Sequence, residues 1–284
     1  MIKRKSGFNR RSTAEQVTRG IDLSGKTAMI TGVNSGLGFE SMRVLVERGA
    51  HVIGAARTIE KATEACARVG GQTTPVACDL SDFDSVVSCA EEVGSLATPI
   101  DILMCNAGIM ALPELEQAYG LELQFVTNHL GHYLLIRHLL DQVIEAPAGR
   151  IVLLSSAAHN FAPLGGIQFS NLSGEKGYSG WKFYGQSKLA NLLTANELAR
   201  RLEATTATAN SLHPGIIQTN LGRHFGGGMA GAMKLFSPLF ERSVEQGAAT
   251  QCYVATSPQL EGVSGKYFAD CNRALTSRYG RNSA

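Results

Sequence analysis

The chain has 284 residues, a formal net charge of +2 at neutral pH and an apolar fraction of 44%. This length suits one large α/β domain or two small ones, with enough apolar residues to bury a core. The near balance of charge gives no reason to expect a nucleic acid or an anionic membrane as partner. The six cysteines are scattered without a C-x-x-C pair. The sequence therefore predicts no disulfide framework, no metal site and a reducing, cytoplasmic setting.

Residues 1–11 are rich in lysine and arginine, and no long apolar stretch follows them. They do not read as a signal peptide or a membrane anchor, and no transmembrane segment is expected. A frayed, solvated terminus is favoured over a nucleic-acid arm or a membrane-surface tether. Ser12 or Thr13 can cap a short helix, since an acidic or amide residue follows three positions later. Residues 1–25 are thus expected to form an extension before a main domain of residues 26–284.

Residues 31–38 read Thr-Gly-Val-Asn-Ser-Gly-Leu-Gly, between an apolar run and a helical pattern. A strand, a glycine turn and a helix in this order form the context in which backbone N–H groups bind phosphates. Gly32 suits a backbone conformation closed to other residues, and Gly36 and Gly38 let the chain approach a pyrophosphate. Taken alone, the pattern also fits a simple tight turn between a strand and a helix.

Apolar runs and helical patterns alternate along the whole chain. Strands are expected at residues 27–31, 51–56, 73–78, 100–105, 150–155, 206–212 and 266–269, and helices at about 36–48, 59–69, 82–93, 120–145, 181–203 and 244–255. Such alternation predicts βαβ units with right-handed crossovers. The expected fold is a single α/β domain with a doubly wound parallel sheet of about seven strands and helices on both faces.

Tyr184 and Lys188 lie four residues apart inside the helix expected at 181–203. Residues at this spacing share one helix face. A nearby ammonium favours a phenolate, so Lys188 is expected to lower the pKa of Tyr184 and make it a general acid or base. Taken alone, the pair also fits a helix with a surface lysine and a partly buried tyrosine.

Ser155 and Ser156 follow the strand expected at 150–155. Ligands of open parallel sheets bind beyond the carboxyl ends of the strands, where a hydroxyl can donate to a carbonyl or alkoxide oxygen. Either serine also fits a simple cap at the end of a strand.

The order of these motifs resembles the short-chain dehydrogenase/reductase family over residues 26–269. The resemblance rests on Thr31–Gly38, Asn106-Ala107-Gly108, Asn128, Ser156, Tyr184, Lys188 and Pro214-Gly215. The retinol-dehydrogenase-like and chloroplast-envelope dehydrogenase-like subgroup is the most similar, through residues 12–17, 128–132, 171–176 and 187–191. The family implies a Rossmann-type sheet, a nicotinamide cofactor and hydride transfer between an alcohol and a ketone or aldehyde.

The resemblance also implies a role for each catalytic residue. Tyr184 exchanges a proton with the substrate oxygen, and Lys188 lowers the pKa of Tyr184 and binds the nicotinamide ribose. Ser156, rather than Ser155, polarises the substrate oxygen. Asn128 holds a water that links Lys188 to solvent. No metal is implied.

Cofactor contacts implied by the resemblance follow the glycine turn and the strand ends. They are Gly32, Asn34, Ser35, Gly36, Leu37 and Gly38 at the turn, Asp79 and Leu80 at the adenine, Asn106, Ala107 and Gly108 along the cofactor, and Pro214, Gly215, Ile217 and Thr219 at the nicotinamide end, together with Tyr184 and Lys188. One departure from the family pattern is Cys105, where many relatives have an additional asparagine.

The end of the second expected strand reads Ala55-Ala56-Arg57. Folds that prefer NAD place an acidic residue there for the ribose hydroxyls, and none is present. The Arg57 guanidinium can pair with a 2′-phosphate instead. The sequence therefore predicts NADP(H) as the preferred cofactor, with NAD(H) still accepted. The alternative is that Arg57 is only a solvated loop residue.

Residues 220–240 are apolar and contain three consecutive glycines. They predict a mobile lid over an apolar pocket, with a plain surface helix–loop–helix as the alternative. The expected substrate is a lipophilic alcohol, ketone or aldehyde, and retinoid-like compounds enter only by analogy with the subgroup. The alternatives are a catalytically silent NADP(H)-binding regulatory protein, or an epimerase or dehydratase of the same family. By resemblance, the helices at 120–145 and 181–203 could pair in a homodimer.

Overall fold

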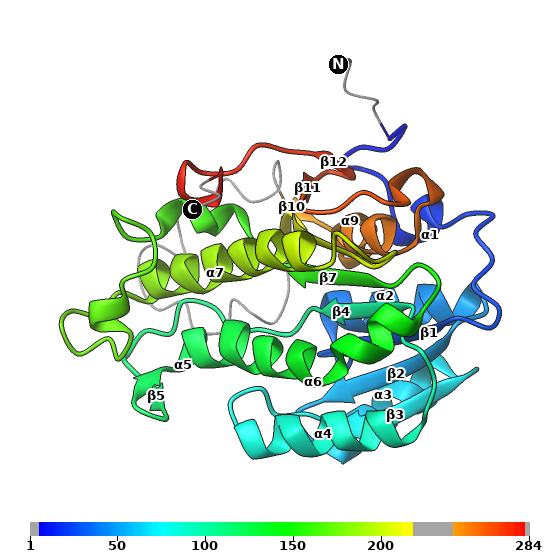
Figure 1. Cartoon of the computed structure of the whole chain (residues 1–284), viewed down its shortest axis with the longest axis horizontal. Helices are drawn as coiled ribbons and strands as arrows, with labels where there is room; N and C mark the ends of the chain where they lie inside the picture. Colours follow the sequence, from blue (N-terminus) through cyan, green and yellow to red (C-terminus); the bar gives the residue numbers. More distant parts are fainter. Residues whose placement is uncertain (1–5, 218–240, 282–284) are drawn as a thin grey trace.

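A computed structural model describes residues 6–217 and 241–281 of the chain. Its central sheet has the strand order β12-β11-β8-β7-β4-β1-β2-β3 (Figure 1). Seven parallel strands are β1 (Thr27–Thr31), β2 (His51–Ala56), β3 (Thr73–Ala77), β4 (Ile102–Cys105), β7 (Arg150–Leu154), β8 (Thr208–His213) and β11 (Tyr267–Ala269). They lie where the alternating pattern predicts them, which confirms the doubly wound α/β fold.

The expected count of about seven strands is wrong by one within the described residues, because β12 (Asn272–Arg273) adds an eighth, antiparallel strand. Asp270 and Cys271 form the two-residue connection from β11, with φ of 55° and 58°. Two successive positive φ values are typical of a tight hairpin turn. A strand of two residues has no room for an alternating pattern, so its sequence gives no strand signal.

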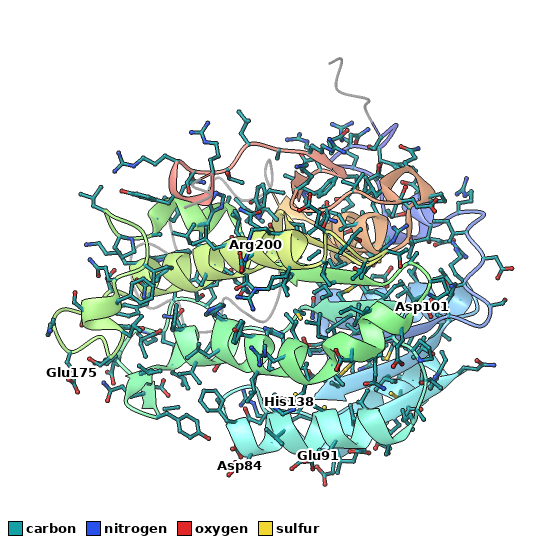
Figure 2. All side chains as sticks on the ribbon, in the orientation of Figure 1. Asp84, Glu91, Asp101, His138, Glu175 and Arg200 are labelled. Carbon is teal, nitrogen blue, oxygen red and sulfur yellow. The ribbon has the colours of Figure 1, made fainter. Side chains whose placement is uncertain are left out.

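Helices cover both faces of the sheet (Figure 1). One face carries α1 (Ala14–Val17), α2 (Gly36–Glu47), α3 (Ile59–Val69) and α9 (Val244–Thr256), and the other carries α4 (Phe83–Ser95), α6 (Gly131–Glu145) and α7 (Gly180–Arg201). Each face has its own apolar core, so the sheet is buried on both sides. In α4, Val86, Ala90 and Val93 turn inward at helical spacing, while Asp84 and Glu91 point outward (Figure 2).

The segment expected as one helix from residue 120 is divided. Residues 117–122 form a hairpin of β5 (Gln117–Ala118) and β6 (Leu121–Glu122), turned by Tyr119 and Gly120 at positive φ. The helix begins only at α5 (Leu123–Phe125) and passes through a π-helical turn, η1 (Val126–Leu130), into α6. The remaining short elements are η2 (Ala157–Phe161), η3 (Phe169–Asn171), β9 (Ile216–Ile217), β10 (Glu241–Arg242), η5 (Pro258–Leu260) and η6 (Tyr279–Arg281).

The segment before β1 packs on the domain. Thr13 caps α1 in a reciprocal capping box with Gln16, as one of the two expected arrangements. Phe8 packs edge-to-face against Tyr253 of α9. The backbone N–H and hydroxyl of Ser6 donate to the Asn272 side chain. The expectation of a frayed, solvated terminus is therefore wrong for Ser6 and Phe8, whereas Gly7 and residues 9–11 are exposed. Residues 1–5 lie outside the described part.

Candidate active site

The predicted motifs meet at one edge of the sheet. The strand order reverses between β1 and β4, because β2 and β3 lie on one side and β7, β8 and β11 on the other. Ligands of doubly wound sheets bind beyond the carboxyl ends of the strands at this reversal. The glycine turn follows β1, residues 106–108 follow β4, and Ser156 follows β7. The fold therefore places these three motifs side by side.

The glycine turn is shaped by the absence of side chains. Gly32 has a φ of +74°, and a Cβ on Gly38 would lie 2.2 Å from the Gly32 carbonyl oxygen. Helix α2 begins at Gly36, and among the described groups the Ser35 side chain makes no capping bond to it. The first N–H groups of α2 thus face the turn, where Asn34 and Ser35 are exposed. This cradle fits a phosphate-bearing group.

Thr31 fixes the position of the loop after β4. Its hydroxyl oxygen accepts the N–H groups of Asn106 and Ala107, each at 3.0 Å. The Asn106 amide donates to the Thr31 carbonyl oxygen at 2.8 Å. Further along, a Cβ on Gly108 would lie 2.9 Å from Asn128 Oδ1 and 3.4 Å from Lys188 Nζ. The backbone at Gly108 therefore passes directly over two of the predicted catalytic side chains.

A buried histidine joins Thr31 to the helix that carries Asn128. His132 Nε2 lies 2.9 Å from the Thr31 hydroxyl, and His132 Nδ1 lies 3.0 Å from the Asn128 carbonyl oxygen. Because the Thr31 oxygen already accepts two N–H groups, its own proton points to Nε2, and Nδ1 carries the ring proton. Burial lowers the pKa of His132 to about 4, so the ring is neutral.

Asn128 lies in the π-helical turn and is fully buried. Its side chain accepts from the Ile109 N–H at 2.8 Å, and donates to the Ile109 carbonyl at 2.9 Å and to the Ser187 hydroxyl at 3.0 Å. Its carbonyl accepts from His132 and, at 3.0 Å, from the Asn191 amide. Asn128 thus fixes the loop after β4 against α7. A water-holding role for it stays a prediction.

Tyr184 and Lys188 share the buried face of α7, as their spacing predicts. Lys188 Nζ lies 5.6 Å from the centre of the Tyr184 ring and donates to the Leu154 carbonyl at 3.2 Å. Gly185 lets η2 pack closely beside them, since a Cβ there would lie 2.6 Å from the Ala158 carbonyl oxygen. The end of β7, η2 and α7 together therefore enclose the two side chains.

The two pKa shifts have the same cause. Burial raises the pKa of Tyr184 to about 12, although hydrogen bonding with Ser156 lowers it in part. Burial also lowers the pKa of Lys188 to about 8. The expectation that Lys188 depresses the pKa of Tyr184 below its ordinary value is wrong for this structure, because desolvation of the buried phenol outweighs the hydrogen bonding with Ser156. Tyr184 is protonated and Lys188 largely charged at neutral pH.

The two serines after β7 differ in their surroundings. The Ser155 hydroxyl is buried and donates to the Lys188 carbonyl oxygen at 2.7 Å, which ties β7 to α7. Ser156 is partly exposed, accepts the Ala158 N–H at 3.1 Å and reaches the Tyr184 hydroxyl. The structure thus brings Ser156, and not Ser155, to the phenol.

The residues after β2 and β3 lie beside each other. The Arg57 side chain is 62% exposed, with Nε 3.8 Å from Asp79 Oδ2. The other oxygen of Asp79 accepts the N–H and hydroxyl of Ser81 at 2.9 and 2.6 Å. Leu80 is buried against α6, where a Cβ on Gly131 would lie 2.3 Å from its carbonyl oxygen. Arg57 is therefore an exposed cation at the rim of the site.

The loop after β8 is held by an arginine. Arg242 donates to the Pro214 carbonyl at 3.2 Å and pairs with Asp270. Gly215 has a φ of +103°, and a Cβ there would lie 2.6 Å from the Arg242 guanidinium. This packing fixes the backbone next to Ile217.

Ile217 and Leu37 meet over α9. A Cβ on Gly247 would lie 2.3 Å from Ile217 and 2.8 Å from Leu37. The predicted nicotinamide end therefore approaches the start of α2. Thr219 and the expected lid at 220–240 lie outside the described residues.

The sequence predicted no role for His132 or Asn191, although they lie in the family-like segments 128–132 and 187–191. Asn191 Nδ2 donates to the carbonyl oxygens of Asn128 and Leu154, each at 3.0 Å. The sequence indicated part of this arrangement, because Asn128 and His132 are four residues apart and so share a helix face, as do Ser187 and Asn191. What the spacing could not show is that the two helices face each other.

Within residues 6–217 and 241–281, no helix is long and apolar enough to cross a membrane. The same part of the chain contains no group of three or more histidine, cysteine or acidic side chains suited to a metal. Its six cysteines are free and buried.

A doubly wound sheet with a glycine turn at its reversal is a dinucleotide-binding fold. A family model described as short chain dehydrogenase matches residues 26–226. The chain is 46% identical over 287 residues to Short-chain dehydrogenase TIC 32 B, chloroplastic, of Brassica napus, which covers 97% of this chain and 89% of that protein. It is 40% identical over 270 residues to Retinol dehydrogenase 12 of Mus musculus, with 93% and 84% covered.

Among solved structures, an uncharacterized protein from Mycobacterium Paratuberculosis is similar, with a TM-score of 0.75 and 32% identity over 94% of this chain and 91% of that one. The chain therefore belongs to the short-chain dehydrogenase family, and it is an oxidoreductase acting on CH–OH groups. The expected resemblance to retinol dehydrogenases and to a chloroplast relative is confirmed.

Proposed function

We propose that the chain is an NADP(H)-dependent oxidoreductase that interconverts a lipophilic alcohol with its ketone or aldehyde. The observation that carries this proposal is the interaction of the Ser156 side chain with the buried phenol of Tyr184, beside Lys188, whose Nζ lies next to Gly108. The similarity to Retinol dehydrogenase 12 supports a lipophilic substrate, since that relative is named for retinol.

A nicotinamide cofactor held at the glycine turn would supply or accept the hydride, and the protein's own residues would stabilise the charge on the substrate oxygen. In reduction, Tyr184 gives its proton to that oxygen, and Ser156 donates a hydrogen bond to it as negative charge develops. With a pKa of about 12, Tyr184 holds this proton across neutral pH. Oxidation needs the phenolate instead, so its rate rises with pH toward that pKa.

Lys188 acts through its charge. Its Nζ is held by the Leu154 carbonyl and lies below the Tyr184 ring. A charged ammonium there stabilises the phenolate that remains after Tyr184 has given up its proton. With a pKa near 8, Lys188 begins to lose this charge just above neutral pH.

The preference for NADP(H) rests on Arg57. Its exposed guanidinium follows β2, and the slot Ala55-Ala56-Arg57 has no carboxylate of its own. The nearby Asp79 carboxylate is partly engaged by Ser81, which leaves Arg57 able to turn to a 2′-phosphate. A cytoplasmic location, a homodimer and the lid stay predictions.

The test is a panel of lipophilic alcohols, ketones and aldehydes, each assayed with NADPH, NADH and their oxidised forms by the absorbance of the reduced nicotinamide. We expect turnover on part of the panel, with a higher kcat/KM for NADPH than for NADH. Tyr184→Phe serves as the control, because it should bind the cofactor and lose turnover. Tight NADPH binding without turnover on any compound would contradict the proposal and favour the regulatory alternative.

A further inference from the structure

We propose that His159 and the backbone of Ser277 form a clamp that positions Ser156. Through this clamp, the segment at residues 274–281 contributes to the activity of the site. His159 and Ser277 are then positioning residues, which touch neither substrate nor cofactor. The proposal rests on the proposed function of Ser156, and it adds a dependence on Ser277, which lies 118 residues after His159.

Two groups of His159 hold the Ser156 carbonyl oxygen. The ring Nδ1 lies 2.5 Å from this oxygen, and the His159 backbone N–H donates to it at 3.1 Å. The Ser156 hydroxyl, on the same residue, is the group that reaches Tyr184. The orientation of Ser156 at the end of β7 is therefore set by a side chain that lies three residues away in η2.

The other ring nitrogen faces the C-terminal segment. The Ser277 backbone N–H donates to His159 Nε2 at 3.0 Å. A backbone N–H is always a donor, so Nε2 must be unprotonated and the ring proton must sit on Nδ1. Burial lowers the pKa of His159, which agrees with a neutral ring. Only this tautomer makes both bonds, so the Ser277 N–H and the Ser156 carbonyl oxygen favour the same form of the ring.

The ring is enclosed and its packing allows little movement. His159 is 1% exposed and packs edge-to-face on Tyr267 of β11, with ring centres 5.1 Å apart. Tyr267 is itself buried close to Tyr184. The clamp thus lies against the same wall that encloses the phenol.

The C-terminal segment is itself anchored at two further points, which makes it a firm support. The Tyr279 hydroxyl accepts the Gly165 N–H at 2.7 Å, and the Gly280 carbonyl accepts the Asn196 amide of α7 at 3.1 Å. The Ser277 hydroxyl accepts the Gly280 N–H at 3.2 Å. Figure 1 shows the red C-terminal stretch running above α7.

Two substitutions separate the two bonds of the ring. His159→Gln places its amide where Nε2 lies, so its oxygen can accept the Ser277 N–H, but no donor remains at the place of Nδ1 beside the Ser156 carbonyl. Ser277→Pro removes the N–H, and Ser277→Ala is its matched control because it keeps the N–H and loses only the hydroxyl. We expect about a tenfold loss of kcat in His159→Gln and in Ser277→Pro, with the dissociation constant of NADPH unchanged and Ser277→Ala near wild type.

A double-mutant cycle tests whether His159 acts through Ser156. In a Ser156→Ala background, His159→Gln should cost no further kcat. An equal loss in both backgrounds would show a general structural effect and overturn the proposal, as would wild-type kcat in His159→Gln. Equal damage from Ser277→Ala and Ser277→Pro would also contradict it.

The clamp can be tested without turnover, so its failure is distinguishable from failure of the proposed function. Nitrogen NMR of the His159 ring, assigned with His159→Gln, reports the tautomer directly. We expect a proton on Nδ1 across neutral pH in the wild-type chain, where the Ser156 carbonyl oxygen accepts it. In Ser277→Pro we expect a shifted Nε2 resonance, because that nitrogen loses the Ser277 N–H. A proton on Nε2 in the wild-type chain would overturn the inference whatever the substrate panel shows.

Discussion

The β1–α2 turn, where we place the phosphates, and the β7–α7 edge, where we place the chemistry, lie along one side of the sheet but are built from different parts of the chain. The turn depends on missing side chains, since a Cβ on Gly38 would collide with the Gly32 carbonyl. The catalytic edge depends on buried polar side chains, among them Tyr184 and Lys188. Changes in the turn should therefore affect binding, and changes at the edge should affect turnover.

The two regions are joined by a fixed polar connection. The Thr31 hydroxyl holds the loop after β4, and through His132 it reaches the carbonyl oxygen of Asn128. Asn191 continues from that oxygen to Leu154, which also holds Lys188. The distance between cofactor and catalytic side chains is thus set by buried hydrogen bonds rather than by the exposed loops.

Gly38→Ala should disturb the phosphate-binding turn more than any other substitution considered for this region. The added Cβ would lie 2.2 Å from a backbone oxygen that cannot move freely. We expect unfolding free energy to fall by about 2 kcal/mol and NADPH affinity to fall by about 100-fold, because the turn is displaced. Urea unfolding and NADPH fluorescence titration measure both.

Gly94→Ala is the matched control for this substitution. Gly94 lies in α4, where a Cβ would meet nothing within 4 Å. Alanine is a better helix former, so this variant should gain about 0.5 kcal/mol and bind NADPH normally. Normal NADPH affinity in Gly38→Ala would contradict the assignment of the turn.

Lys188→Met tests the catalytic edge and should separate activity from stability. The Lys188 pKa falls from 10.5 to about 8 on folding, which corresponds to about 3 kcal/mol of destabilisation at neutral pH. Methionine should therefore raise the unfolding free energy by about 1–3 kcal/mol while kcat falls by about 100-fold. The Leu154 carbonyl oxygen still accepts a hydrogen bond in this variant, because the Asn191 amide also donates to it.

The stabilisation by Lys188→Met should depend on pH with a defined sign. Because the folded pKa of Lys188 is depressed, the cost of its charge is fully present below about pH 8. The cost disappears as pH rises through the unfolded value of 10.5. Urea unfolding at about pH 7 and about pH 10 should show a smaller difference between the two chains at the higher pH. A pH-independent difference would point to packing instead.

Arg57→Ala should give the smallest effect of these substitutions, and it should change cofactor binding without changing turnover. Arg57 is exposed and its ion pair with Asp79 is long, so the fold should not change measurably. We expect about a tenfold rise in KM for NADPH with NADH kinetics unchanged. Equal losses for the two cofactors would mean that Arg57 does not read the 2′-phosphate.

Much of the fold follows from local signals in the sequence. The seven parallel strands, the capped α1 and the shared face of Tyr184 and Lys188 depend on short-range periodicity and caps, which a single chain displays. The β5–β6 hairpin and β12 could not be found this way. Their turns place Tyr119, Asp270 and Cys271 at positive φ. This conformation is uncommon for residues other than glycine, so nothing in the sequence indicated these turns.

The residues of the site could be predicted from motifs, but their burial and their hydrogen-bond partners could not. The family resemblance predicts that Ser156 and Tyr184 act together. The raised pKa of Tyr184 follows from its burial, which the spacing of residues in the sequence does not show. The role of Ser277 is equally hidden, because it acts through its backbone N–H and has no side-chain signature.

The most direct test of the central claim is the turnover of Tyr184→Phe at saturating NADPH, once one carbonyl substrate is known. The substitution removes a single oxygen from the catalytic edge and leaves the glycine turn untouched. The account predicts a loss of at least about 1,000-fold in kcat with wild-type NADPH affinity. Turnover within about tenfold of wild type would show that another group transfers the proton, and it would contradict the separation of binding from chemistry.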